Sequence, residues 1–149
     1  MAKIELQPDF KDFLKLLNSH GVRYLLVGGY AVGYYGYPRA TGDMDIWVAV
    51  DKENAAKTAA VLCEFGMPEK DVSDTLFLEK NQIIRMGFPP VRIEILTGVS
   101  GINFDDCFNR RKSVDIDGIG VSLISVEDLK KNKKAAGRHQ DLQDLEHLP

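Results

Sequence analysis

The segment from residue 43 to residue 50 constrains the fold more than any other part of the chain. Asp43, Asp45 and Trp47 alternate along it with apolar residues, which is the period of a β-strand whose two faces differ. The two carboxylates therefore point to the same side of the strand, where they repel each other unless a cation lies between them. We expect the opposite side to be buried, and it carries Met44, Ile46, Val48 and Val50.

A glycine pair precedes this strand, with thirteen residues between the pair and Asp43. Gly28 and Gly29 follow the apolar run 23–27, which predicts a buried strand, and precede a predicted short helix over residues 30–35. Such a turn leaves backbone N–H groups free to approach phosphate oxygens near the positive end of a helix. Position 30 is Tyr where a dinucleotide-binding fingerprint needs Gly, which weakens a nicotinamide-dependent interpretation.

The rest of the chain alternates helical and strand patterns, with no repeat and no long linker. We therefore expect a single domain over residues 1–149, with C-terminal helices in 125–148 packed on it. The other predicted elements are helices over 9–19, 51–65, 104–111, 125–134 and 138–148, and strands over 82–86, 91–96 and 113–124, the last folded back at Asp117-Gly118.

Composition limits the classes of function. The chain has 149 residues, of which 44% are hydrophobic, and this is enough for a real core. Its formal net charge of -3 argues against a surface built wholly to hold nucleic acid, although a local basic cluster could still do so. Such a cluster is formed by Lys130, Lys131, Lys133, Lys134 and Arg138.

The sequence also favours a cytoplasmic protein that does not enter a membrane. Cys63 and Cys107 are too few for a disulfide-stapled secreted fold, and the charged start at residues 1–5 is unlike a signal segment. The longest uncharged stretch, residues 24–38, is shorter than the roughly 20 residues that a membrane helix needs.

The paired aspartates suit Mg²⁺, a hard cation that proteins usually share with substrate phosphates. Together with the glycine pair and Glu94, in the strand pattern Arg92-Ile93-Glu94-Ile95, they resemble the signature of the DNA polymerase beta type nucleotidyltransferase superfamily. The likeness runs from about Val22 to Leu148. More narrowly, residues 39–46, 92–101 and 133–138 with Asp141 resemble small stand-alone bacterial members, the minimal nucleotidyltransferases and the nucleotidyltransferase toxins of abortive-infection systems.

This resemblance implies an α/β (α+β) nucleotidyltransferase fold, a small mixed sheet flanked by helices. It also implies an activity: Asp43, Asp45 and Glu94 hold two Mg²⁺ ions, with Mn²⁺ as an alternative, while an acceptor oxygen attacks the α-phosphate of an NTP and pyrophosphate leaves. The third carboxylate would assist deprotonation of the acceptor. The implied acceptor is a protein or a tRNA, and a partner protein or the second copy of a homodimer would help to define it.

Further residues follow from the same likeness, each with a second interpretation. Arg39 and Thr41 would contact phosphate or merely shape the loop, and Lys133 and Arg138 would bind phosphates or form a solvated face. Asp141 would hold one of these two cations in place. The expected nucleotide-binding set is Gly28, Gly29, Arg39, Thr41, Lys133, Arg138 and Asp141.

The roles of Glu94 and Trp47, and the function itself, allow more than one interpretation. Glu94 shares a strand face with Arg92, so the two could form an ordinary surface ion pair. Trp47 could stack on a base or be buried under the last helix. A non-catalytic nucleotide-binding or toxin–antitoxin module with the same fold is the competing function, and nucleotidylation of a small antibiotic would need an added helical domain. Asp71, Asp74 and Glu79 compete weakly with Glu94 as the third carboxylate.

Overall fold

The computed structural model describes residues 4–38 and 41–149, apart from the side chain of Asp74. All predicted helices and strands are present, and two short 3-10 helices were not predicted. No helix in the described part of the chain is long and apolar enough to cross a membrane. In chain order the elements are α1 (Pro8–Ser19), β1 (Tyr24–Val27), α2 (Gly28–Tyr34), β2 (Asp43–Val48), α3 (Lys52–Phe65), η1 (Glu69–Asp71), η2 (Asp74–Phe77), β3 (Ile83–Met86), β4 (Arg92–Leu96), α4 (Phe104–Asn109), β5 (Lys112–Ile116), β6 (Ile119–Leu123), α5 (Val126–Ala136) and α6 (His139–His147).

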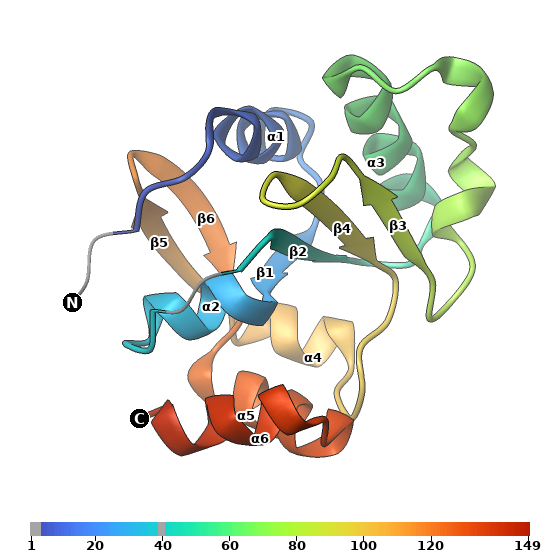
Figure 1. Ribbon diagram of the computed structural model, residues 1–149. Coiled ribbons are helices and arrows are strands. Elements are labelled where there is room, and N and C mark those ends of the chain that lie inside the picture. The colour runs from blue at the N-terminus through green and yellow to red at the C-terminus, as the bar shows by residue number, and fades with distance from the viewer. Residues whose placement is uncertain (1–3, 39–40) are drawn as a thin grey trace.

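The strands form one mixed sheet in the order β3-β4-β2-β1-β6-β5. Strand β2 is antiparallel to β1 and parallel to β4, while β1 is parallel to β6. The outer strands β3 and β5 each pair with their neighbours as antiparallel hairpins. Helices α1 and α3 lie on one side of the sheet, and α4, α5 and α6 lie on the other (Figure 1). The predicted small mixed sheet with flanking helices is therefore confirmed.

Helix α1 shows why one side of the sheet is closed. Pro8 occupies the first turn, where its missing N–H costs nothing, and the helix stops before Gly21. Its apolar stripe is fully buried against the sheet and α3, and Phe13 packs edge to face on Phe65 of α3 with ring centroids 5.1 Å apart. The stripe consists of Phe10, Phe13, Leu14 and Leu17.

Strand β2 separates the core from the chemical face, as its alternation predicts. Met44 and Ile46 are completely buried, whereas Asp43 and Asp45 keep partial exposure on the other face. Trp47 is 2% exposed and packs edge to face on Phe104 of α4, with ring centroids 5.1 Å apart. Trp47 is thus covered by α4 and not by the last helix, and it has no free face for a base.

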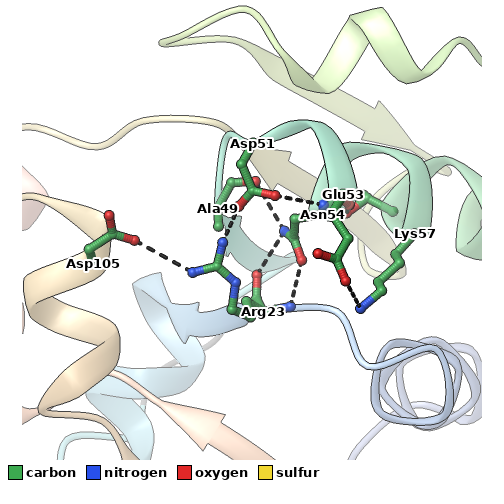
Figure 2. Close-up of polar contacts among 8 residues, drawn as sticks. Arg23, Ala49, Asp51, Glu53, Asn54, Lys57 and Asp105 are labelled. Atoms are coloured by element: carbon green, nitrogen blue, oxygen red, sulfur yellow. Dashed lines mark hydrogen bonds and ion pairs between the residues drawn. The ribbon is translucent and has the colours of Figure 1, made fainter.

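The start of α3 is tied to β1 by a polar network at the end of the sheet away from the aspartate pair (Figure 2). Asp51 caps α3 by accepting from the Asn54 backbone N–H at 2.8 Å. The Asn54 amide accepts from the Arg23 N–H at 2.8 Å and donates to the carbonyls of Arg23 and Ala49 at 3.1 and 3.0 Å. Every polar atom of this buried amide is therefore satisfied, which fixes the register of β1 against α3.

Candidate functional site

The sheet brings the three predicted carboxylates together. Strands β2 and β4 are parallel neighbours, and their register places Asp45 opposite Glu94 and Asp43 opposite Arg92. Because residues opposite each other on one face are in reach of their partners, Asp43, Asp45 and Glu94 form one group, which we name the carboxylate cluster. Among the weaker candidates, Asp71 and Glu79 are exposed and do not line the same cavity.

Asp45 lies at the centre of the cluster and is the least satisfied of the three. Its Oδ1 is buried without a hydrogen-bond partner. Burial raises the pKa of Asp45 to about 7, helped by the charges of Glu94 and Asp43, while Lys133 and Arg138 act in the opposite direction. A carboxylate in this environment gains strongly from any cation that reaches it.

Gly28 makes room for the Asp45 side chain. It has a φ of +66°, and a Cβ built on it would lie 2.1 Å from Oδ2 of Asp45. Gly28 begins α2 directly after β1, so the predicted glycine turn is part of the helix and not a loop before it. Gly29 is close to Thr41, whose hydroxyl accepts from the Asp43 N–H at 3.4 Å and donates to the Asp43 carbonyl at 3.1 Å. Thr41 therefore shapes the approach to β2.

Two arginines hold the carboxylate cluster from the β3–β4 side. Arg92 donates from Nε and from Nη2 to the two Asp43 oxygens at 2.6 and 3.0 Å, and its Nη2 is also 3.2 Å from Oε1 of Glu94. Arg85, on β3, donates to the same Glu94 oxygen at 3.2 Å. The predicted pairing of Glu94 with Arg92 exists, but Arg92 bonds more closely to Asp43.

The opposite wall carries charged residues on α5, on α6 and at the N-cap of α6, most of them buried. Lys133 is 5% exposed, and its Nζ lies 3.2 Å from Asp141 and 3.1 Å from Asp144, both of which are buried. Arg138 is largely exposed and donates from Nε to Asp141 at 2.8 Å. Burial disfavours the Asp141 charge, yet hydrogen bonds from Arg138 and Lys133 lower its pKa below the usual value. Asp141 was expected to hold one of these two cations, and it contacts both.

A cleft of about 700 Å³ lies between these walls and is large enough for a nucleotide. The residues of the expected nucleotide-binding set that line it are Gly28, Gly29, Thr41, Lys133, Arg138 and Asp141, together with the whole carboxylate cluster. Arg39 lies outside the described residues.

A second cavity of about 660 Å³ adjoins the cleft along the same face of the sheet. The two share Gly98 and Val99, which follow β4. One wall of the second cavity carries Arg23, which is paired with Asp51 and lies 3.6 Å from Asp105 (Figure 2). Trp47 and Phe104 also line this cavity.

The donor set of the cluster fits a divalent cation, although Arg92 now engages it. Three carboxylates with one orphaned buried oxygen are hard ligands of the kind that Mg²⁺ prefers. Within residues 4–38 and 41–149, however, no three His, Cys, Asp or Glu side chains are grouped to hold a metal ion as they stand. Because Arg92 occupies both Asp43 oxygens, a cation would need that side chain to move.

Sequence reasoning missed three features of this site. Arg85 reaches Glu94 only through the β3–β4 register, which no local pattern reveals. Asp144 follows Asp141 by one helical turn, a spacing that could have indicated a second partner for Lys133. The bond from Arg92 to Asp43 was not predicted, since the shared strand face indicated only a pair with Glu94.

A protein family matches almost the whole chain. A family described as "Nucleotidyl transferase of unknown function (DUF2204)" matches residues 7–149. The chain belongs to this family. No curated protein matches the sequence.

Two solved structures share the fold of this nucleotidyl transferase family member. One is a candidate nucleotidyltransferase from Thermotoga maritima, with a TM-score of 0.62 and 17% identity over 95% of this chain and 93% of that one. The other is an antigenic nucleotidyltransferase-like protein from Paracoccidioides brasiliensis, with a TM-score of 0.56 and 18% identity over 93% of this chain and 72% of that one. The nucleotidyltransferase fold implied by the resemblance is thus confirmed.

The α5–α6 wall leads to a prediction that separates Lys133 from Arg138. Lys133→Met should lower the free energy of unfolding by about 3 kcal/mol, because it removes the two buried ion pairs that Lys133 makes with Asp141 and Asp144. Arg138→Ala should raise the dissociation constant for NTP roughly 10- to 100-fold with a much smaller change in melting temperature, since this exposed side chain lines the cleft and can exchange Asp141 for phosphate. Calorimetric titration and thermal melts measure both. A melting temperature that falls in Arg138→Ala with unchanged NTP affinity would assign Arg138 to the scaffold.

Proposed function

We propose that this protein transfers an NMP group from an NTP to a hydroxyl of a protein or RNA acceptor and releases pyrophosphate, with Mg²⁺ or Mn²⁺ as cofactor. The observation that carries the proposal is the environment of Asp45. Its carboxylate is desolvated and crowded by Glu94 and Asp43, and it keeps an unpartnered oxygen at a nucleotide-sized cleft. Stability alone would not favour three acidic side chains in such a place, whereas phosphoryl chemistry needs them.

The two walls of the cleft would have different functions in the reaction. Asp43, Asp45 and Glu94 would hold the cations, which supply charge stabilisation at the attacking and leaving oxygens when they are bound. Arg138 would face the triphosphate, and Lys133, which also lines the cleft, would add positive potential. The acceptor oxygen forms a bond to the α-phosphorus, its proton passes to Glu94, and the bond from the α-phosphorus to the pyrophosphate oxygen breaks.

The acceptor would approach from the side of the second cavity. That cavity shares Gly98 and Val99 with the cleft and offers space beside the carboxylate cluster on the same face of the sheet. A partner protein or a second copy of the chain would complete the acceptor site.

The test is a transfer assay with each of the four α-³²P-labelled NTPs and Mg²⁺ or Mn²⁺. The acceptors are the protein itself, bulk tRNA and cell lysate, and the label is followed by gel. We expect label on a protein or on tRNA with wild type and with Asp71→Asn, an exposed control outside the cleft, and none with Asp45→Asn. If every NTP fails with every acceptor while Mg²⁺-dependent NTP binding persists, the protein is a nucleotide-binding module and the transferase proposal is wrong.

Glu94 allows a second prediction about the same site. Glu94→Gln should reduce turnover at least 100-fold but change NTP affinity less than threefold, because Glu94 would accept the proton of the acceptor hydroxyl while the two aspartates anchor the bound nucleotide. Glu79→Gln, an exposed site away from the cleft, is the matched control. Steady-state rates and calorimetric titration give the two quantities. Equal losses in both would make Glu94 a plain ligand, and wild-type behaviour would reduce it to the partner of Arg85 and Arg92.

A further inference from the structure

Arg92 occupies the position in the carboxylate cluster that a cation would need. Its guanidinium makes two hydrogen bonds to Asp43 and an ion pair to Glu94, so it joins two of the three carboxylates. The sheet itself sets this arrangement, because Arg92 is opposite Asp43 on β2 and two residues before Glu94 on β4. The contact is therefore a built feature of the cluster and not a chance approach of two long side chains.

The surroundings of this contact make it costly for a free cation to displace Arg92. Arg92, Asp43 and Glu94 are 29%, 28% and 13% exposed, so water screens their charges only partly. A paired Arg–carboxylate fork in such surroundings is stronger than a surface ion pair. An incoming Mg²⁺ must shed water and also break these contacts, while Asp45 alone offers it an unpartnered oxygen.

A nucleotide bound in the cleft would favour movement of the Arg92 side chain away from Asp43 and Glu94. Its side chain lines the cleft, in which a triphosphate would bring new anionic oxygens. Because a guanidinium binds phosphate as well as it binds carboxylate, a bound nucleotide offers Arg92 a replacement partner. The cation that accompanies the nucleotide then finds both Asp43 oxygens released and Glu94 held by Arg85 alone among these two arginines.

We infer that Arg92 is a positioning residue that makes cation binding by the carboxylate cluster conditional on nucleotide. In the free protein it acts as a built-in counter-cation that keeps Mg²⁺ off Asp43 and Glu94, and the triphosphate draws it away. This inference rests on the metal site of the proposed function. It goes further by giving Arg92 a role in the order of binding that transfer alone does not require.

Mn²⁺ binding measured by electron paramagnetic resonance tests this without any turnover. Wild type, Arg92→Gln and Arg85→Gln are titrated with Mn²⁺ alone and then with a non-hydrolysable α,β-methylene NTP present. We expect Arg92→Gln to bind Mn²⁺ alone at least tenfold more tightly than wild type, because a positive charge beside the site is gone. The gain in Mn²⁺ affinity that the analogue gives should shrink at least tenfold. Arg85→Gln is the comparison variant, since it removes a positive charge beside Glu94 but leaves the hydrogen bonds from Arg92 to Asp43 in place. It should gain much less Mn²⁺ affinity than Arg92→Gln and keep the increase in affinity that the analogue gives.

Two further variants show whether the charge of Arg92 and the carboxylate cluster determine Mn²⁺ binding. Arg92→Lys retains the charge and provides a second variant if Arg92→Gln does not fold, and we expect it to bind Mn²⁺ alone as weakly as wild type. Asp45→Asn combined with Arg92→Gln should lose the new Mn²⁺ affinity, which places the ion in the cluster. Unchanged Mn²⁺ affinity in Arg92→Gln would overturn the inference even if NMP transfer is observed. The expected Mn²⁺ results without transfer to any acceptor would leave the inference intact and count against the proposed function.

Discussion

Asp45→Asn is expected to abolish NMP transfer and, at the same time, to stabilise the metal-free protein at pH 8. The amide keeps the shape of the side chain but carries no charge, so it no longer repels Glu94 and Asp43 and no longer pays for desolvation. We expect the melting temperature in EDTA to rise by roughly 10 °C, which corresponds to about 2–4 kcal/mol for a chain of this size. A residue whose removal destroys activity yet improves stability is there for function.

The stabilisation by Asp45→Asn should depend on pH, because only the charged form of Asp45 is disfavoured in the folded protein. The pKa of Asp45 is about 7 in the folded protein and 3.8 in an unfolded chain, so the folded state holds more protons between these values. The contribution of Asp45 to the free energy of unfolding is therefore full below pH 4, falls as the pH rises towards 7, and stays low above it. The free energy of unfolding of Asp45→Asn should not show this decrease between pH 4 and pH 7.

Thermal melts from pH 4 to pH 8 in EDTA measure both effects, with Asp71→Asn as the exposed control that should follow wild type. An Asp45→Asn melting temperature at or below that of wild type at pH 8 would show that the carboxylate is not strained in the folded protein. The same comparison at pH 4 should show little difference, because Asp45 is then protonated.

Much of the fold follows from short-range patterns. The alternation of residues 43–48 predicts which side of β2 is buried, and Asp117-Gly118 predicts the β5–β6 hairpin because both residues adopt the positive φ that this turn requires. The glycine pair and the paired aspartates likewise indicate a phosphate and metal site. These inferences hold because each depends on neighbours in sequence.

The missing parts of the site depend on long-range packing. Arg92 meets Asp43 across 49 positions of sequence, so its preference for Asp43 over Glu94 becomes visible only once β2 and β4 are known to be parallel neighbours. Lys133 shares a helical side with Lys130 and Lys134, but helical period does not say that α6 covers Lys133 and leaves Lys134 exposed. Sequence thus predicts which charges belong to the site better than it predicts their partners.

The second large effect is expected from a substitution of Gly28. Gly28→Ala should reduce NMP transfer at least 100-fold, because the new Cβ would overlap Oδ2 of Asp45, 2.1 Å away, and displace the carboxylate. Ala at a φ of +66° also costs about 1–2 kcal/mol of stability by backbone strain alone.

Gly21→Ala separates the two causes, since Gly21 has a φ of +67° and the nearest atom to its Cβ would be the flexible end of Lys57 at 3.8 Å. We expect Gly21→Ala to lose a few degrees of melting temperature and no activity, whereas Gly28→Ala loses more stability and its transfer activity. In an Asp45→Ala background the extra stability cost of Gly28→Ala should largely disappear, because the overlapping carboxylate is gone, and a double-mutant cycle on the melts measures this. An equal cost of Gly28→Ala in both backgrounds, or a Gly28→Ala protein with wild-type transfer, would show that Gly28 serves the backbone turn and not the placement of Asp45.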